Sequence, residues 1–189
     1  YLNKCAIAAG FLSCLLAGQA VAHGVYATER QGETVIVYGH GPRDEKYENK
    51  DLLSLGGYDK AGKPVEITHR SNNGYVTFSP NETVRAISAS FDNGYWSEQP
   101  DGEWVKKPKD QVEGAKQGGQ YLKYNTTILQ TLGSKPKSTG APLEILPLVD
   151  PLTLKQGDKL AVQVLAAGKP VPNIELATEF TTDRANNVV

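Results

Sequence analysis

Short runs of β-branched and aromatic residues, each closed by a turn, dominate this sequence and constrain its fold more than any other feature. The runs at 25–30 and 33–38 are separated only by Gln31-Gly32, which predicts a β-hairpin. Further runs of the same kind lie at 52–58, 64–69, 74–79 and 84–91. Because short strands joined by turns are typical of antiparallel sheets, we expect an all-β fold.

The chain is predicted to form two units of antiparallel β-sandwich type. An N-terminal β domain is expected over residues 23–140. In the C-terminal module, over residues 141–189, runs at 143–147 and 160–165 alternate with turns in an order that suits a small antiparallel sandwich. The sequence begins without a methionine and stops directly after a strand-like segment, so we expect a fragment whose C-terminal module is incomplete.

Residues 92–120 interrupt the strand pattern and are expected to form a long loop of the N-terminal domain. The segment is polar and rich in Lys, Gly and Pro, yet it carries aromatic side chains. These side chains either form a stacking platform for sugars or a partner, or hold the loop against the sheet. They are Tyr95, Trp96 and Trp104, together with Tyr121 directly after the segment.

Residues 1–22 have the three parts of a secretory signal peptide. Lys4 supplies the positive region, an apolar stretch follows at 6–17, and Ala20-Val21-Ala22 matches the small-residue cleavage pattern. Cleavage after Ala22 makes His23 the first residue of the mature chain, whereas cleavage two residues earlier leaves it third. The apolar stretch is shorter than the roughly 20 residues of a membrane span, so we expect no stable membrane anchor after cleavage.

Cysteine content and charge exclude several classes of function. Both cysteines, Cys5 and Cys14, lie in the signal segment, and the sequence has no methionine. The exported chain is therefore expected to be stabilised by its core without disulfides, and any metal site has to use nitrogen and oxygen ligands. The formal net charge of −1 argues against a nucleic-acid partner.

Two of the three histidines are predicted to meet across the first hairpin. If the turn is centred between Gln31 and Gly32, the numbers of opposed residues sum to 63, so His23 faces His40. This register holds for a two- or four-residue loop and fails for a three-residue loop. The two imidazoles and the new α-amine of His23 would then converge. Three such nitrogen atoms suit a divalent transition metal, and Ni²⁺, Co²⁺, Cu²⁺ and Zn²⁺ are all compatible.

Other residues near the predicted pair are candidate ligands or have a purely structural interpretation. An oxygen ligand is available from Tyr38, Asp44 or Glu45. His69 precedes a turn and is interpreted as a surface residue, with metal ligation as the alternative. The structural interpretation of the pair itself is that His40 caps a strand end and His23 belongs to a frayed terminus.

Several motifs of this sequence resemble a bacterial periplasmic family of unknown-function domains. The resemblance rests on Ala-His-Gly-Val-Tyr at 22–26, Val-Tyr-Gly-His-Gly at 37–41 and Phe-Asp-Asn-Gly-Tyr-Trp at 91–96. Further matching motifs lie at 100–104, 121–124 and 142–152. Members of that family are often labelled nickel uptake transporter family proteins or periplasmic components of cobalt transport.

The resemblance implies a periplasmic, β-rich protein whose C-terminal sandwich is immunoglobulin-like or carboxypeptidase-regulatory-like. It also implies a role in Ni²⁺ or Co²⁺ uptake, with a component of a membrane metal transporter as the partner. The family positions that are suited to chelation correspond to His23 and His40.

No catalytic residue is predicted. The sequence has no Ser/His/Asp grouping and no phosphate-binding glycine-rich loop, so we expect a binding protein rather than an enzyme. The favoured function is capture of Ni²⁺ or Co²⁺ for a membrane transporter. One alternative is a structural or interaction β-sandwich without metal. The other is a copper-dependent polysaccharide oxidase, a class that also begins with His-Gly on a β-sandwich.

Overall fold

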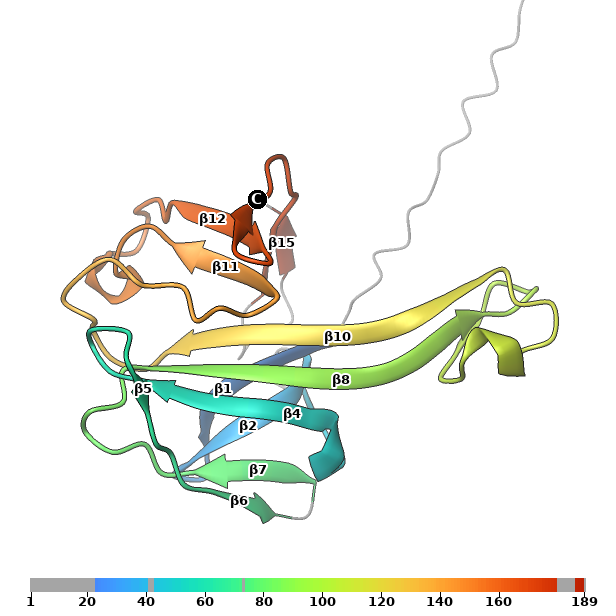
Figure 1. Ribbon diagram of the computed structural model, residues 1–189, viewed down its shortest axis with the longest axis horizontal. Helices are drawn as coiled ribbons and strands as arrows, with labels where there is room; N and C mark the ends of the chain where they lie inside the picture. The colour runs from blue at the N-terminus through green and yellow to red at the C-terminus, as the bar shows by residue number, and fades with distance from the viewer. Residues whose placement is uncertain (1–22, 41–42, 73, 180–185, 189) are drawn as a thin grey trace, which may run out of the picture.

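The computed structural model describes residues 23–40, 43–72, 74–179 and 186–188. These residues form fifteen strands and three 3₁₀ helices of one turn each, so the predicted all-β fold is confirmed (Figure 1). The 3₁₀ helices are η1 (Asn49–Asp51), η2 (Lys109–Gln111) and η3 (Pro151–Thr153). No helix in these ranges is long and apolar enough to cross a membrane. The predicted signal segment, residues 1–22, lies outside the described residues.

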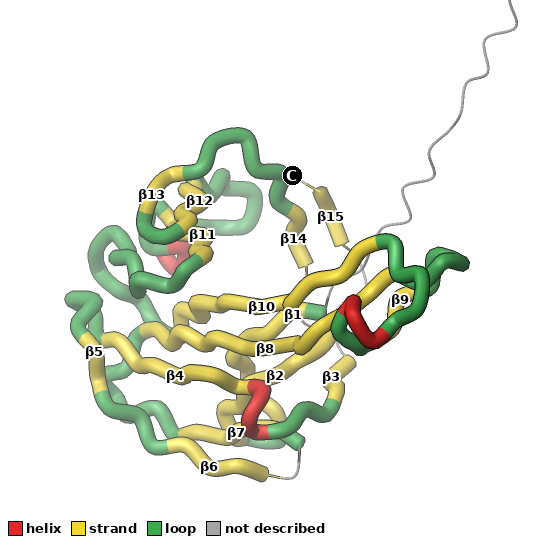
Figure 2. Tube along the Cα trace, turned by 45° about the vertical axis from the view of Figure 1, so that its right-hand side comes forward, coloured by secondary structure: helices red, strands yellow, loops and turns green. Residues whose placement is uncertain are grey.

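Two antiparallel sheets make up the larger part of the fold. The first has the strand order β1-β2-β7-β6, with β3 on the end of β2, and the second has the order β10-β8-β4-β5, with β9 on β8. The strands of the first sheet are β1 (Gly24–Arg30), β2 (Glu33–His40), β3 (Arg43–Glu45), β6 (His69–Asn72) and β7 (Tyr75–Phe78). Those of the second are β4 (Leu52–Tyr58), β5 (Pro64–Val65), β8 (Ala86–Glu98), β9 (Trp104–Val105) and β10 (Gln117–Ile128). The sheets lie over one another with a shared hydrophobic core (Figures 1 and 2).

The first hairpin has the predicted register. Arg30 pairs with Glu33 at the turn, and every further pair of β1 and β2 follows the same sum of residue numbers. Gln31 and Gly32 have φ angles of 53° and 82°, and two consecutive positive φ angles are what a two-residue type I′ turn requires. The prediction of opposed side chains along this hairpin is therefore confirmed.

The core is built from alternating residues that the two sheets direct toward each other. In the first hairpin this row contains Val25 and Ala27 of β1, with Tyr38 and Ile36 opposite them on β2. The second sheet contributes Phe91 of β8, which is 2% exposed. Its ring stacks on Tyr38 with the ring centroids 4.8 Å apart. Phe91 therefore joins the two sheets close to the end of β2.

Tyr47 closes a gap in the first sheet where β2 and β7 separate. The two strands pair only as far as Ile36 opposite Val76. The hydroxyl of Tyr47 donates to the carbonyl of Ile36 at 2.9 Å and accepts the N–H of Val76 at 2.8 Å. The ring packs edge-on against Phe91, with centroids 5.3 Å apart. One buried side chain thus takes the place of a missing inter-strand hydrogen bond.

Replacing Tyr47 by phenylalanine is expected to destabilise the protein by about 1–3 kcal/mol. The change keeps the ring but leaves the buried N–H of Val76 and carbonyl of Ile36 without their shared partner. Urea unfolding measures the effect. Tyr58→Phe is the matched control, because within the described residues the contacts of the Tyr58 hydroxyl with Ser88 and Thr139 are long, at 3.3 and 3.5 Å. Equal unfolding free energies for the two variants would contradict the bridging role of Tyr47.

The C-terminal part of the chain forms two further small sheets. One contains β11 (Leu143–Pro147), β12 (Val162–Ala166) and β13 (Lys169–Pro170), and the other pairs β14 (Ala177–Glu179) with β15 (Asn186–Val188). The division of the chain into domains at residues 140 and 141 stays a prediction.

Two buried carboxylates fix the segment that leads from the second sheet to β11. Asp150 accepts the N–H groups of Leu132 and Gly133 at 2.6 and 3.1 Å. Glu144 accepts the hydroxyl of Ser138 and the N–H of Thr139 at 2.6 and 2.9 Å. Because burying a carboxylate is costly unless it is hydrogen-bonded, these contacts explain why both acids lie inside the fold.

The prediction of a long loop over residues 92–120 is wrong at both ends. β8 runs through residue 98 and β10 begins at residue 117, so the two strands form a ribbon that projects beyond the sandwich (Figure 1). Only residues 99–116, at the tip, lie outside these two strands. Residues 117–122 are all exposed, so backbone pairing rather than burial holds this part of the ribbon. A strand exposed in this way lacks the alternation of apolar and polar residues by which strands are recognised.

Candidate metal centre

The structure brings the side chains of His23 and His40 together. β1 begins at Gly24, which pairs with Gly39 of β2. One residue further along the same register, the rings of His23 and His40 have centroids 4.3 Å apart and planes inclined by 36°. Because side chains alternate along a strand, the two histidines continue the core row that contains Tyr38 and end it at the edge of the core.

Glu45 lies against the histidine pair. β3 pairs Glu45 with Tyr38, which puts both side chains on one face of the sheet. Oε1 of Glu45 lies 2.6 Å from Nε2 of His23. The two side chains are 41% and 32% exposed, so solvent reaches the site. A side chain at position 39 would collide with the backbone carbonyl of Arg43, so the close approach of β3 depends on Gly39.

The ring of Tyr38 packs against one face of the His23 ring. The two rings stack with centroids 5.1 Å apart and planes inclined by 27°. The hydroxyl of Tyr38 donates to Oδ1 of the buried Asn93 at 2.7 Å. Burial, with a smaller contribution from the charge of Glu45, raises the pKa of Tyr38 to about 12. The phenol therefore stays neutral at physiological pH, and Tyr38 contributes a stacking surface rather than an anionic oxygen.

Asp44 is engaged elsewhere. Its carboxylate accepts two hydrogen bonds from Arg30, from Nε at 2.7 Å and from Nη2 at 2.9 Å. The pairing of Asp44 with Gly39 puts it on the other face of β2 from His40. There it forms part of the rim of a cavity of about 440 Å³ whose wall includes Val35 and Val37. Asp44 is thus a structural partner of Arg30 and not a neighbour of the histidine rings.

His69 is not brought to the histidine pair. It is exposed and begins β6, the edge strand that lies two strands away from β2. It pairs with Phe78, which in turn pairs with Thr34 near the turn end of the hairpin. Thr34 lies near the start of β2, whereas His40 is the last residue of that strand. The position of His69 supports its interpretation as a surface residue.

Side chains alone do not complete a metal site in the described part of the chain. Within it, no group of three or more His, Cys, Asp or Glu side chains is arranged to hold a metal ion. Where β1 starts and β2 ends, the structure brings together the imidazoles of His23 and His40 and the carboxylate of Glu45. The carboxylate is hydrogen-bonded to His23. The third nitrogen of the predicted site, the α-amine that cleavage before His23 would create, stays a prediction.

The aromatic residues of the β8–β10 ribbon form a separate surface. Trp104 and Tyr121 meet edge to face with ring centroids 6.1 Å apart, and both are more than two-fifths exposed. Tyr95 is also exposed, whereas Trp96 donates its indole N–H to the carbonyl of Asn93 at 3.0 Å. Trp96 is thus fixed to its own strand, while Tyr95, Trp104 and Tyr121 expose their rings on the ribbon.

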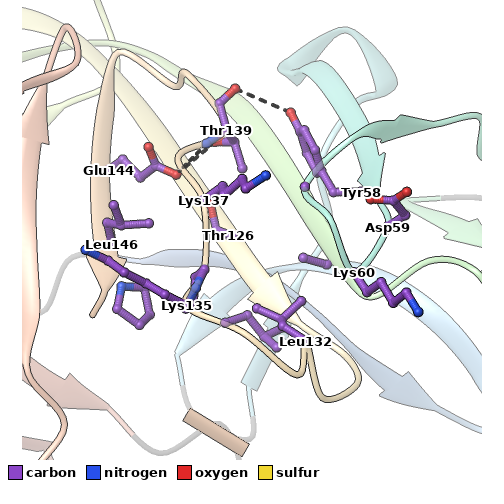
Figure 3. Close-up of a pocket in the computed structure, with 15 residues that line it drawn as sticks. Tyr58, Asp59, Lys60, Thr126, Leu132, Lys135, Lys137, Thr139, Glu144 and Leu146 are labelled. Carbon is purple, nitrogen blue, oxygen red and sulfur yellow. Dashed lines mark hydrogen bonds between the residues drawn. The ribbon is translucent and has the colours of Figure 1, made fainter. Parts of the chain in front are cut away.

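A second cavity lies where the second sheet meets β11, and Figure 3 shows its lining. Tyr58 and Lys60 approach from one side, and Glu144 and Leu146 from the other. Glu144 already accepts hydrogen bonds from Thr139. The cavity measures about 30 Å³, which is room for about one water molecule. It is therefore a packing gap between parts of the fold rather than a ligand site.

The structure defines the class of this protein, and comparison with known proteins identifies its family. The fold and the histidine pair define an all-β, antiparallel protein with two imidazoles at one edge of its core. The chain belongs to the family described as a domain of unknown function, DUF4198, whose model matches residues 20–188. It is similar to an uncharacterized protein of Haemophilus influenzae, with 29% identity over 172 residues, covering 90% of this chain and 73% of that relative. No solved structure matches.

Proposed function

We propose that the mature protein begins at His23, resides in the periplasm and binds a divalent transition metal; Ni²⁺ or Co²⁺ is the favoured physiological ion, and Cu²⁺ and Zn²⁺ are also compatible with the site. In this proposal it assists metal uptake by delivering the ion to a component of a membrane transporter. The observation that carries the proposal is the contact of the His23 and His40 rings, 4.3 Å between centroids, at the residue that predicted cleavage would make N-terminal.

The proposed ligands are the α-amine and imidazole of His23 and the imidazole of His40. Neutral imidazole and amine nitrogen both suit late first-row divalent metals. The hairpin register and the stacking of His23 on Tyr38 support the proposal, because they hold one imidazole beside the other before any metal arrives. The remaining coordination positions would be taken by water.

Calorimetric titration tests the proposal with four separate metals, Ni²⁺, Co²⁺, Cu²⁺ and Zn²⁺, added to protein that begins at His23. We expect one tight site per chain, with Ni²⁺ or Co²⁺ retained under conditions of competition with a weak chelator. Micromolar or weaker binding of all four would contradict metal capture and favour a structural or interaction protein. Hydrogen peroxide production by the copper-loaded protein with a reductant would instead favour an oxidase.

A further inference from the structure

We infer that Glu45 is a positioning residue that holds His23 so that Nδ1 rather than Nε2 is available for the metal, an inference that rests on the proposed function. Glu45 would then act through His23 and would not itself be a ligand. The geometry that points to this role is the 2.6 Å contact between Oε1 of Glu45 and Nε2 of His23.

The first step follows from the chemistry of the two groups. An ionised carboxylate only accepts hydrogen bonds, so the proton of this contact has to be on Nε2 of His23. In a neutral imidazole with the proton on Nε2, the only free lone pair is on Nδ1. Which ring nitrogen binds a metal is set by the hydrogen bond that the other nitrogen makes. Glu45 therefore selects Nδ1.

The second step concerns the α-amine of His23. A metal held by this amine and by Nδ1 of the same residue closes a six-membered ring through Cα, Cβ and Cγ. Nε2 lies on the far edge of the imidazole and does not reach the same ion as the amine. The nitrogen that the hydrogen bond of Glu45 leaves open is thus the one that terminal chelation needs.

The third step is that the fold restrains both partners of this contact. The pairing of β3 with β2 fixes Glu45 opposite Tyr38. The ring of Tyr38 in turn stacks against the ring of His23. The hydrogen bond sets which edge of the imidazole faces Glu45, and the stacking sets the plane of the ring. A carboxylate bound to the outer nitrogen of a ligating histidine is a recurrent means of orienting it.

The test begins with metal-free protein that starts at His23 and carries ¹⁵N-labelled histidine. Long-range ¹H–¹⁵N spectra at about pH 8 report the tautomer of each ring. We expect the proton of His23 on Nε2 in the parent and in Glu45→Gln, whose amide oxygen still accepts a hydrogen bond. We expect a mixture of tautomers in Glu45→Leu. An unchanged His23 tautomer in Glu45→Leu would overturn the inference.

Metal titration of the same variants separates positioning from ligation. A positioning role predicts that Glu45→Leu weakens Ni²⁺ binding by about 10–100-fold and that Glu45→Gln restores most of it. Asp44→Asn, a change in the neighbouring carboxylate that binds Arg30, is the control and should leave affinity unchanged. Equal losses in Glu45→Gln and Glu45→Leu would identify Glu45 as a ligand and overturn the inference. If no metal binds to the parent, the proposed function fails, while the spectra of the metal-free protein still decide the role of Glu45.

Discussion

His40→Ala is expected to weaken Ni²⁺ binding by at least about 100-fold, more than the loss of an outer-sphere partner costs. The substitution removes one of the three proposed nitrogen ligands. The two that remain belong to one residue, as in any peptide that begins with histidine. Because His40 ends β2 at the edge of the core, the strand and its register should persist without its ring. Calorimetric titration gives the affinity, and circular dichroism checks that the fold is retained.

His69→Ala is the matched control for this prediction. It removes an equal imidazole from the same sheet, at a strand that the structure separates from the histidine pair. Its Ni²⁺ affinity should equal that of the parent. If His40→Ala binds as tightly as His69→Ala does, the ring contact of His23 and His40 has no part in metal binding.

Phe91→Ala is expected to cost about 3–5 kcal/mol of the free energy of unfolding, which would leave the protein largely unfolded or marginally stable. Phe91 is 2% exposed and touches the rings of both Tyr38 and Tyr47. Its removal leaves a cavity between the two sheets that the rigid strands cannot fill. Urea unfolding measures the loss of unfolding free energy if the variant folds. If it does not fold, it shows no cooperative unfolding transition.

Leu53→Ala is the control for core truncation, because Leu53 lies on β4 of the same sheet as Phe91 but is 55% exposed. Its effect should be within about 0.5 kcal/mol of zero, as for ordinary surface positions. Since Tyr38 supports the ring of His23, a folded Phe91→Ala variant should also bind metal less tightly. Equal stabilities of the Phe91 and Leu53 variants would contradict the described core.

The first hairpin was predictable from the sequence because a short turn leaves few choices. With Gln31-Gly32 as the two turn residues, the register follows, and with it the meeting of His23 and His40. The runs at 52–58 and 64–69 also flank a polar turn, and the structure pairs β4 with β5 across it. Their paired part is short, from Gly57 opposite Val65 to Tyr58 opposite Pro64.

Other features depend on contacts that sequence spacing does not encode. The projecting ribbon has no buried face over residues 117–122, so no apolar pattern distinguished its strands from a loop. The contact of Glu45 with His23 requires β3 to pair antiparallel with the end of β2, and no residue pattern in the sequence indicated this pairing. Tyr38 stood out in the sequence as an oxygen ligand, but its buried partner Asn93 comes from the other sheet, 55 residues away.

Cleavage before His23 and export to the periplasm stay predictions. They rest on residues outside the described part of the chain and on the motif resemblance. The match of the family model begins at residue 20, close to the predicted cleavage site, so the histidine pair falls inside the family domain. In this proposal the α-amine of His23 is the third nitrogen ligand beside the two imidazoles.

The most direct measurement compares Ni²⁺ binding by protein that begins at His23 with binding by protein that keeps Ala22 ahead of it. The extra alanine converts the α-amine into an amide nitrogen and leaves both imidazoles and Glu45 in place. We predict one tight site in the first protein and at least about 100-fold weaker binding in the second, because the nitrogen that completes the chelate is lost. Equal affinities in the two proteins would contradict a terminal metal site.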